Sequence, residues 1–159
     1  MDVKFEELAE DSRIWIYQSN REFTEEEVSE ISIGLKRFLE SWTSHKKPFK
    51  SAFQIKYNRF IIIAVDKDFE VSGCSIDASV SFIQFIEKKY QVDLLDRRNI
   101  TYKTANTIKF ISLAEFKTLI KSKSINKDTI VFNNLVSNIF EYNNHWKTSI
   151  KNSWHSRFL

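Results

Sequence analysis

Apolar and polar residues alternate with the period of a strand in several segments of the chain's first half. Residues 13–19 alternate in this way, and residues 52–57 and 60–65 are two β-rich runs. Asn58 and Arg59 join these two runs and are typical of a tight turn, so we expect a hairpin. The run at 60–65, FIIIAV, is apolar on both faces, which predicts a central strand.

Between the first strand and the hairpin, the period changes to that of an amphipathic helix. Thr24 is a good N-cap, and Glu27 three residues later completes a capping box. The apolar stripe that follows consists of Val28, Ile31, Leu35, Phe38, Leu39 and Trp42. The pattern ends near His45 and Pro48, so we expect the helix to end there.

A second helix is predicted over residues 75–90, after a polar loop. Phe82 and Phe85 widen its apolar face, so we expect it to be deeply packed. The order strand, helix, strand, strand, helix, with residues 100–103 as a possible further strand, matches the ferredoxin-like split βαβ plan. We therefore expect an α+β sandwich domain over residues 1–103.

Shorter elements follow from residue 104 onward. The pattern predicts a strand at 107–111, a helix at 113–121 opened by a capping box of Ser112 and Glu115, and a strand at 129–132. We expect these elements to form a small basic α+β module, residues 104–159, that is rich in aromatic side chains.

Four stretches together resemble a family of short bacterial proteins often labelled "ABC transporter ATPase". They are SRIWIYQSN at 12–20, NRFIIIAVD at 58–66, SGCSIDASV at 72–80 and DTIVFNNLV at 128–136. The label implies ATP hydrolysis, which needs closely spaced glycines followed by Lys and Ser or Thr to wrap the phosphates. Gly34 and Gly73 are the two glycines of the chain. The sequence therefore excludes a P-loop ATPase.

The C-terminal third, residues 107–147, resembles the small GYF-like modules that bind peptides or serve as adaptors. The shared features are a strand, LAEFKTLI at 113–120, INKDTIVF at 125–132, and Trp146. Lys123 stands where such modules usually have Gly, and Phe132 where they usually have Trp. The resemblance implies a GYF-like fold and a peptide or protein partner.

The amino-acid composition indicates a folded protein and bears on its location in the cell. Hydrophobic residues make up 42% of the 159 residues, which is enough for a packed core. The N-terminus lacks the apolar stretch of a signal peptide, and the longest apolar run is too short to span a bilayer. We therefore expect a cytoplasmic protein without a membrane span. Cys74 is the single cysteine, which excludes an intramolecular disulfide and a cysteine-based zinc site.

Charge is distributed unevenly along the chain. Residues 1–45 carry a net charge of −6, residues 46–100 of +3 and residues 101–159 of +6. The basic end is compatible with a nucleic-acid or acidic-protein partner, but attraction between the two halves of the chain is the simpler explanation.

The most specific candidate for a ligand site is the sequence SGCSID, where the polar loop enters the second helix. The amide groups at a helix N-terminus can bind an anion, and the same field would activate a thiol. The candidate residues are Arg59, Ser72, Gly73, Cys74, Ser75 and Asp77, with Cys74 as a candidate nucleophile. The alternative is structural: one of these residues caps the helix, and Asp77 complements the helix dipole.

The sequence contains little evidence for a catalytic site or for a metal site. A thiol enzyme needs a histidine base, yet His45, His145 and His155 belong to no recognisable motif with Cys74. Asp66 and Asp68 follow a strand, where carboxylates usually serve turn formation. We therefore expect no metal ion and no cofactor.

The C-terminal stretch HWKTSIKNSWHSRFL is basic and aromatic. If it is helical, it is suited to a partner groove, a membrane surface or RNA; otherwise its aromatic side chains belong to the core. The candidate partner-binding residues are Trp146, Lys147, Lys151, Trp154 and Arg157.

Taken together, these patterns favour a non-enzymatic adaptor or protein-interaction protein. The alternatives are a small-ligand or thiol protein centred on Gly73 to Asp77, and an RNA- or ribosome-associated factor that uses the basic C-terminal half. The oligomeric state stays open.

Overall fold

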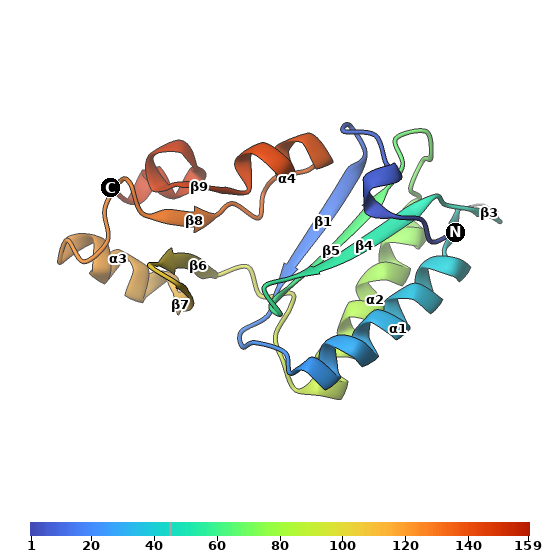
Figure 1. Ribbon diagram of the computed structural model, residues 1–159, viewed down its shortest axis with the longest axis horizontal. Coiled ribbons are helices and arrows are strands. Elements are labelled where there is room, and N and C mark those ends of the chain that lie inside the picture. Colours follow the sequence, from blue (N-terminus) through green and yellow to red (C-terminus); the bar gives the residue numbers. More distant parts are fainter. Residues whose placement is uncertain (45) are drawn as a thin grey trace. The chain divides into compact units, whose positions relative to one another are not determined.

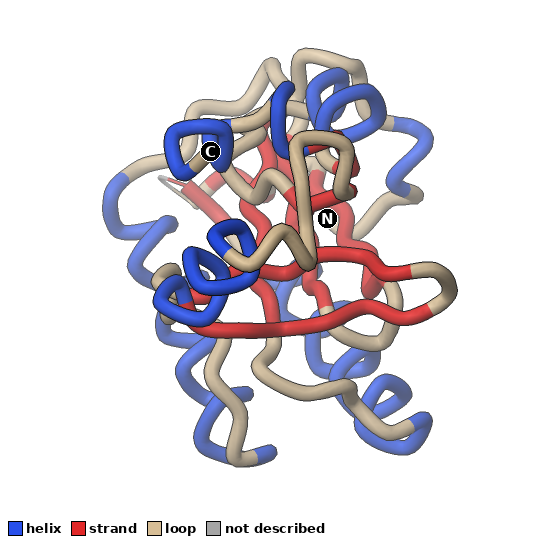
Figure 2. The backbone as a smooth tube through the Cα atoms, turned by 90° about the vertical axis from the view of Figure 1, so that its left-hand side faces the viewer, coloured by secondary structure: helices blue, strands red, loops and turns tan. Residues whose placement is uncertain are grey.

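The computed structural model describes residues 1–44 and 46–159, which form a mixed α+β protein (Figure 1). The chain divides into two units. The first unit contains residues 1–95 and 137–140, and the second unit contains residues 96–136 and 141–159. The helices and strands of both units are traced in Figure 2. The α+β class expected from the sequence is confirmed.

The first unit is built on a three-stranded antiparallel sheet in the order β1-β5-β4. Its strands are β1 (Arg13–Gln18), β4 (Ser51–Lys56) and β5 (Phe60–Val65). Both outer strands run antiparallel to β5, so β1 and β4 are parallel to each other. This is the split βαβ arrangement, and it confirms both the hairpin and the central position of residues 60–65.

The further strand predicted at residues 100–103 exists but does not join this sheet. Strand β6 (Asn99–Thr104) pairs with strands of the second unit, which therefore begins before the expected boundary at residue 103. The free edge of β1 is bridged by residues 137–140, far away in the sequence. The Ile14 amide donates to the Ser137 carbonyl at 3.0 Å, and the Ile139 amide donates to the Ser12 carbonyl at 3.1 Å.

Two helices, α1 (Glu25–Ser41) and α2 (Gly73–Tyr90), cover one face of the first sheet (Figure 1). The capping box that opens α1 is present as predicted. The Thr24 hydroxyl accepts from the Glu27 amide at 3.1 Å, and the Glu27 carboxylate accepts from the Thr24 amide at 2.9 Å. The helix ends at Ser41, before the predicted position, and His45 lies outside the described residues.

The core of the first unit lies between these helices and the sheet. Leu35 and Leu39 of α1, Ile61 and Ile63 of β5, and Ile83 of α2 are completely or almost completely buried. They occupy the apolar stripe and strand positions that the sequence pattern indicates. Burial of such side chains is the main stabilising contribution to this unit.

The expectation that the widened face of α2 is deeply packed was wrong for Phe85. Its side chain is 56% exposed, whereas the adjacent Ile86 is 1% exposed. Neighbouring residues on a helix are about 100° apart around its axis, and the buried face of α2 follows Ser75, Ser79, Ile83 and Ile86. The exposed Phe85 is therefore outside the core-facing stripe.

An ion pair ties the two helices together at one end of the first unit. Arg21 donates to both carboxylate oxygens of Glu27 at 2.8 Å each, and also to the carbonyl of Tyr90 at 2.6 Å. Arg21 thus joins the start of α1 to the last turn of α2, where the helix dipole favours a cation. The hydrogen bonds that Glu27 accepts from Arg21 and from the Thr24 amide hold its pKa at about 2, below its usual value.

Short elements complete the first unit. They are the 3-10 helix η1 (Phe5–Glu7), which contacts β4, and the small ribbon formed by β2 (Thr43–Ser44) and β3 (Lys47–Pro48).

The second unit contains a four-stranded antiparallel sheet in the order β7-β6-β8-β9. Its further strands are β7 (Thr107–Ser112), β8 (Ile130–Phe132) and β9 (Lys147–Ser149). Helix α3 (Leu113–Lys121) follows β7, and its cap residue Ser112 accepts from the Glu115 amide at 3.1 Å, which is the N-cap half of the predicted capping box. Helix α4 (Ile139–His145) precedes β9.

The C-terminal stretch does not form the continuous amphipathic helix considered as one alternative. After β9 it forms two 3-10 turns, η2 (Ile150–Asn152) and η3 (Trp154–Phe158). Ile150 and His155 are buried, and Ile150 joins Phe116 of α3 and Val131 of β8 in the core of the second unit. This end of the chain is therefore partly structural.

No helix within residues 1–44 and 46–159 combines the length and the apolar character that crossing a membrane requires.

Candidate functional sites

At the start of α2, Ser72 and Ser75 form hydrogen bonds that stabilise the fold. The Ser72 hydroxyl accepts from the Ser75 amide at 3.2 Å and lies 2.8 Å from the Ser75 hydroxyl. Ser75 is buried; its hydroxyl donates to the Thr43 carbonyl at 2.7 Å, and its own carbonyl accepts from Trp42 Nε1 at 2.9 Å. The capping role that was the alternative to a ligand site is thus filled by Ser72, and Ser75 fastens α2 to the end of α1.

A cavity of about 620 Å³ nevertheless opens beside this helix end. It is lined by Phe38, Ser41, Trp42, Thr43, Ala78 and residues 72–75. Cys74 is exposed there, and a Cβ at Gly73 would meet nothing within 4 Å. The space that a side chain at Gly73 would occupy is therefore open, and Asp77 is exposed.

Arg59 lies far from this cavity. It is buried in the turn before β5, where its guanidinium donates to the Ser19 carbonyl at 3.4 Å. The neighbouring Asn20 bonds to Asp93 just after α2, so Arg59 belongs to the C-terminal end of that helix. An 18-residue helix is about 27 Å long, which separates Arg59 from Gly73. Burial lowers the pKa of Arg59, which has a structural role in the turn.

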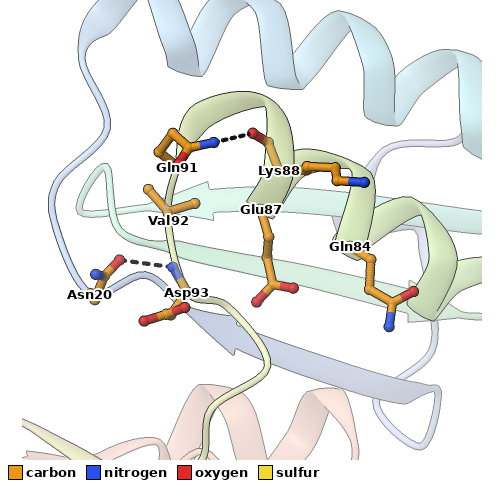
Figure 3. A pocket seen from close by; sticks show the side chains of 7 residues that line it. All are labelled: Asn20, Gln84, Glu87, Lys88, Gln91, Val92 and Asp93. Carbon is orange, nitrogen blue, oxygen red and sulfur yellow. Dashed lines mark hydrogen bonds between the residues drawn. The ribbon is translucent and has the colours of Figure 1, made fainter.

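A polar cavity of about 630 Å³ lies at that C-terminal end of α2 (Figure 3). It is lined by Asn20, Gln84, Glu87, Lys88, Gln91, Val92 and Asp93. The Glu87 carboxylate accepts from the amides of Leu94 and Leu95 at 2.8 and 3.1 Å, and the Asn20 side chain accepts from the Asp93 amide at 2.9 Å. These groups hold the chain as it leaves α2, so we assign the cavity no ligand.

An apolar groove of about 290 Å³ runs between α1 and α2 on the face away from the sheet. Ile33 and Phe85 on its walls are 53% and 56% exposed. Phe82 stacks on Phe38, with ring centres 4.9 Å apart, and its ring tip reaches Gly34. The signal for this groove in the sequence is weak, because Ile33 lies outside the apolar stripe of α1. An isolated exposed Ile is common on protein surfaces.

Trp146, expected as a partner-binding residue, is buried with 3% exposure. Its ring packs against Phe132 and Tyr142, with ring centres 5.0 and 4.9 Å apart, and its Nε1 donates to the Asn134 side chain at 2.9 Å. The aromatic and hydrogen-bonding groups of Trp146 are therefore used inside the second unit rather than presented to a partner.

The remaining residues of the basic stretch lie at or near the surface. Lys147 on β9 is exposed, and Lys151 is exposed and pairs with Asp128 at 3.1 Å. Trp154 is half-buried and stacks on His155, with ring centres 3.9 Å apart. His155 is buried, which lowers its pKa to about 4, and its Nδ1 lies 2.8 Å from the Ser153 hydroxyl.

Two cations flank the ring of Phe158 near the C-terminus. Lys117 Nζ lies 5.3 Å and Arg157 Cζ 5.2 Å from the ring centre, and Arg157 also lies 5.9 Å from the Trp154 ring. We call Lys117, Trp154, Arg157 and Phe158 the cation–aromatic cluster. Among the described residues, no carboxylate forms an ion pair with either cation. Sequence reasoning missed Lys117 because it contacts Phe158 across the fold.

The part of the chain that the structure describes contains no group of three or more His, Cys, Asp or Glu side chains able to hold a metal ion. His45, the single histidine that the sequence places in the first unit with Cys74, is outside that part.

The chain was compared with family models, with curated proteins and with solved structures, and no match was found in any of the three. The resemblances to the short bacterial family and to GYF-like modules therefore stay predictions.

Proposed function

We propose that this protein is a non-enzymatic adaptor that binds an acidic segment of another protein through the cation–aromatic cluster of its second unit. The cluster belongs to α3 and η3, and its rings, Trp154 and Phe158, pack against the core of the second unit. The observation that carries the proposal is the placement of Lys117 and Arg157 within 5.3 Å of one ring, with no ion-paired carboxylate on either among the described residues.

The electrostatics of the whole unit support an acidic partner. The second unit contains 11 Lys and Arg against 4 Asp and Glu, a net charge of +7, whereas the first unit carries −4. Two of the four acids, Asp96 and Asp128, already pair with Arg98 and Lys151. Such a surplus of positive charge attracts negatively charged partners and accelerates their association.

The half-buried rings of Trp154 and Phe158 determine which acidic partner fits best. Each half-buried ring leaves part of its apolar surface exposed next to a cation, a combination suited to a carboxylate that has an apolar neighbour in the peptide. A guanidinium can bind a carboxylate through two parallel hydrogen bonds, which adds geometric specificity. The expected ligand is an Asp or Glu flanked by an aromatic or aliphatic residue.

Selection from a displayed library of random peptides, carried out with the full chain, tests this function. We expect enriched peptides to contain Asp or Glu beside an apolar residue. Their affinity should fall about tenfold or more for the Lys117→Gln/Arg157→Gln variant, the loss expected for a charge-assisted contact. The matched control is Lys121→Gln/Lys123→Gln, which removes two exposed cations that the structure places outside the cluster.

The alternative partner, RNA, gives a different result in the same experiment. Phosphate contacts make binding decrease steeply with salt and make it insensitive to sequence. If bulk RNA displaces the selected peptides and binds more tightly than they do, the protein-adaptor function is wrong. Equal loss in the cluster and control variants would show that net charge, rather than the cluster, determines binding.

A small-ligand protein is the second candidate, supported by the 620 Å³ cavity beside residues 72–75. Cys74 borders this cavity and is exposed, so its reaction with a disulfide reagent reports on the site. A rate above that of free cysteine, lowered by added anions, would support a ligand or thiol function there. A rate equal to that of free cysteine would contradict an activated thiol.

A further inference from the structure

The groove between α1 and α2 exposes more apolar side chain than helix packing within one chain requires. Ile33 of α1 and Phe85 of α2 both line it, each more than half exposed, and so do Gly34 and Phe82, which lie beside each other. Adjacent large apolar side chains on an otherwise polar helix face are typical of a surface that another molecule covers.

The charges at the two ends of the groove indicate which molecule fits. Glu30 and Arg37 both line the groove and are seven residues apart on α1, two turns or about 10.5 Å. Ile33 and Gly34 lie midway between them. The Glu30 carboxylate forms an ion pair with Lys89 Nζ at 3.6 Å and accepts a hydrogen bond from the Tyr90 hydroxyl at 3.2 Å. Arg37 is exposed, and the described residues offer it no ion pair.

This pattern is complementary to itself under a two-fold rotation. If a second α1 lies antiparallel on the first, with the axis at Ile33 and Gly34, then Glu30 of each copy lies opposite Arg37 of the other. Gly34 has no side chain at the point of closest approach, so the two helices can come close there. We propose that a second copy of this chain covers the groove and forms a homodimer through α1 and α2.

The size of the surface indicates a reversible association. A 17-residue helix is about 25 Å long, and two packed helices are about 20 Å wide, which gives roughly 500 Å² per copy. The total of about 1,000 Å² is at the low end for specific interfaces. We therefore expect a dissociation constant in the micromolar range, and a mass that depends on concentration.

Sedimentation equilibrium of the full chain tests the dimer. We expect the wild type to change from monomer to dimer between about 1 and 100 µM. Ile33→Asp and Phe85→Asp should remain monomeric, because each places a charge in the apolar contact. Both side chains are exposed, so these variants should fold, as circular dichroism can verify. Leu135→Asp, at an equally exposed apolar side chain outside the groove, should leave the dimer unchanged.

A charge exchange tests the two-fold geometry itself. Arg37→Glu should weaken the dimer about tenfold, because it places two acids opposite each other. The double variant Glu30→Arg/Arg37→Glu should restore the association, since both pairs are re-formed with reversed sign. The pair that Glu30 loses with Lys89 is exposed and contributes little.

Three results would overturn the proposal. They are a wild type that stays monomeric at about 100 µM, a dimer that survives Ile33→Asp and Phe85→Asp, and a double variant that is no better than Arg37→Glu alone. Peptide binding by the cation–aromatic cluster is measured separately, so failure of either proposal leaves the other standing.

Discussion

Gly34 of α1 lies directly beside the ring of Phe82 of α2: a Cβ built at Gly34 would be 3.4 Å from Phe82 Cζ. This distance is an ordinary van der Waals contact, so the ring does not require a glycine below it. Glycine in a helix interior costs about 1 kcal/mol relative to alanine. Packing within a single chain therefore does not explain why a glycine occupies position 34.

The variant Gly34→Ala distinguishes the effect of this glycine on the stability of one chain from its effect on dimerisation. We expect the free energy of unfolding to rise by up to about 1 kcal/mol in urea titrations, because the added methyl group fits beside Phe82. The same variant should weaken dimerisation, since the methyl group enters the point where two copies approach most closely. A variant that is less stable than the wild type would mean that Phe82 cannot accommodate even this small group.

Glu27→Gln is expected to reduce stability through the loss of the Arg21 ion pair. We expect a loss of about 1 kcal/mol at neutral pH, because Arg21 is partly exposed and the pair is screened by solvent. The folded-state pKa of Glu27, about 2, is below the ordinary value of 4.5. Its contribution is therefore complete above about pH 4.5 and is lost as the pH falls toward 2.

The control for this prediction is Glu26→Gln, which removes the neighbouring exposed carboxylate from the same first turn of α1. Thermal unfolding measured between pH 7 and pH 2 should show a flatter acid limb for Glu27→Gln than for Glu26→Gln. Identical acid limbs would contradict a pKa of Glu27 lowered by Arg21.

Lys123→Gly should stabilise the second unit. Lys123 follows α3 with φ of 62°, a left-handed conformation that costs a non-glycine residue about 1 kcal/mol. The amides of Ser124 and Lys123 bond to the carbonyls of Leu119 and Ile120 at 3.0 and 3.1 Å, the pattern of a Schellman motif. We expect a gain of about 0.5–1 kcal/mol in urea unfolding.

Lys121→Gly is the matched substitution for Lys123→Gly. It removes a similar exposed lysine two positions earlier, inside the last turn of α3. That variant should lose stability by about 0.5–1 kcal/mol, because glycine is unfavourable within a helix. Effects of the same sign in both variants would show that loss of charge, rather than backbone conformation, determines the result.

His155 is expected to make the second unit sensitive to mild acid. Burial lowers its folded-state pKa to about 4, from 6.5. The unfolded chain thus binds a proton that the folded chain does not, so stability is complete above about pH 6.5 and decreases as the pH falls toward 4. The largest loss is about 3 kcal/mol.

Trp154 stacks on His155, so fluorescence of a variant that retains Trp154 as its single tryptophan reports unfolding of this region. His155→Gln should flatten the decrease in stability between pH 6.5 and 4, whatever its cost at neutral pH. His145→Gln, at an exposed histidine of the same unit, should leave the decrease intact. A decrease that persists in His155→Gln would mean that other groups cause it.

The sequence was sufficient for the local structure and insufficient for the pairing between distant segments. The box of Thr24 and Glu27, the cap at Ser112 and the doubly apolar strand at 60–65 follow from neighbouring residues, and all three are present. Strand β6 was recognised as a strand, but its partners were not, because the choice between two sheets depends on contacts distant in the sequence.

The candidate sites, like the strand pairing, could be predicted from the sequence only where they depend on neighbouring residues. The groups at Ser72 and Ser75 were identified correctly as polar residues of a helix start, but only their bonds to each other, to Trp42 and to Thr43 show that they are already used. The cation–aromatic cluster and the groove between α1 and α2 join residues from separate elements. A periodic pattern indicates which side of a helix is apolar, but not which exposed residues will meet.

The bridge between β1 and residues 137–140 has a consequence for how this protein is made. Ser137 emerges from the ribosome only after residues 1–95 have done so, and until then the edge of β1 in the nascent first unit stays unpaired. An open strand edge can pair with another chain during this interval. Slower translation of residues 96–136 should therefore lower the yield of correctly folded protein, and expressing the first 95 residues alone should leave that edge permanently unprotected.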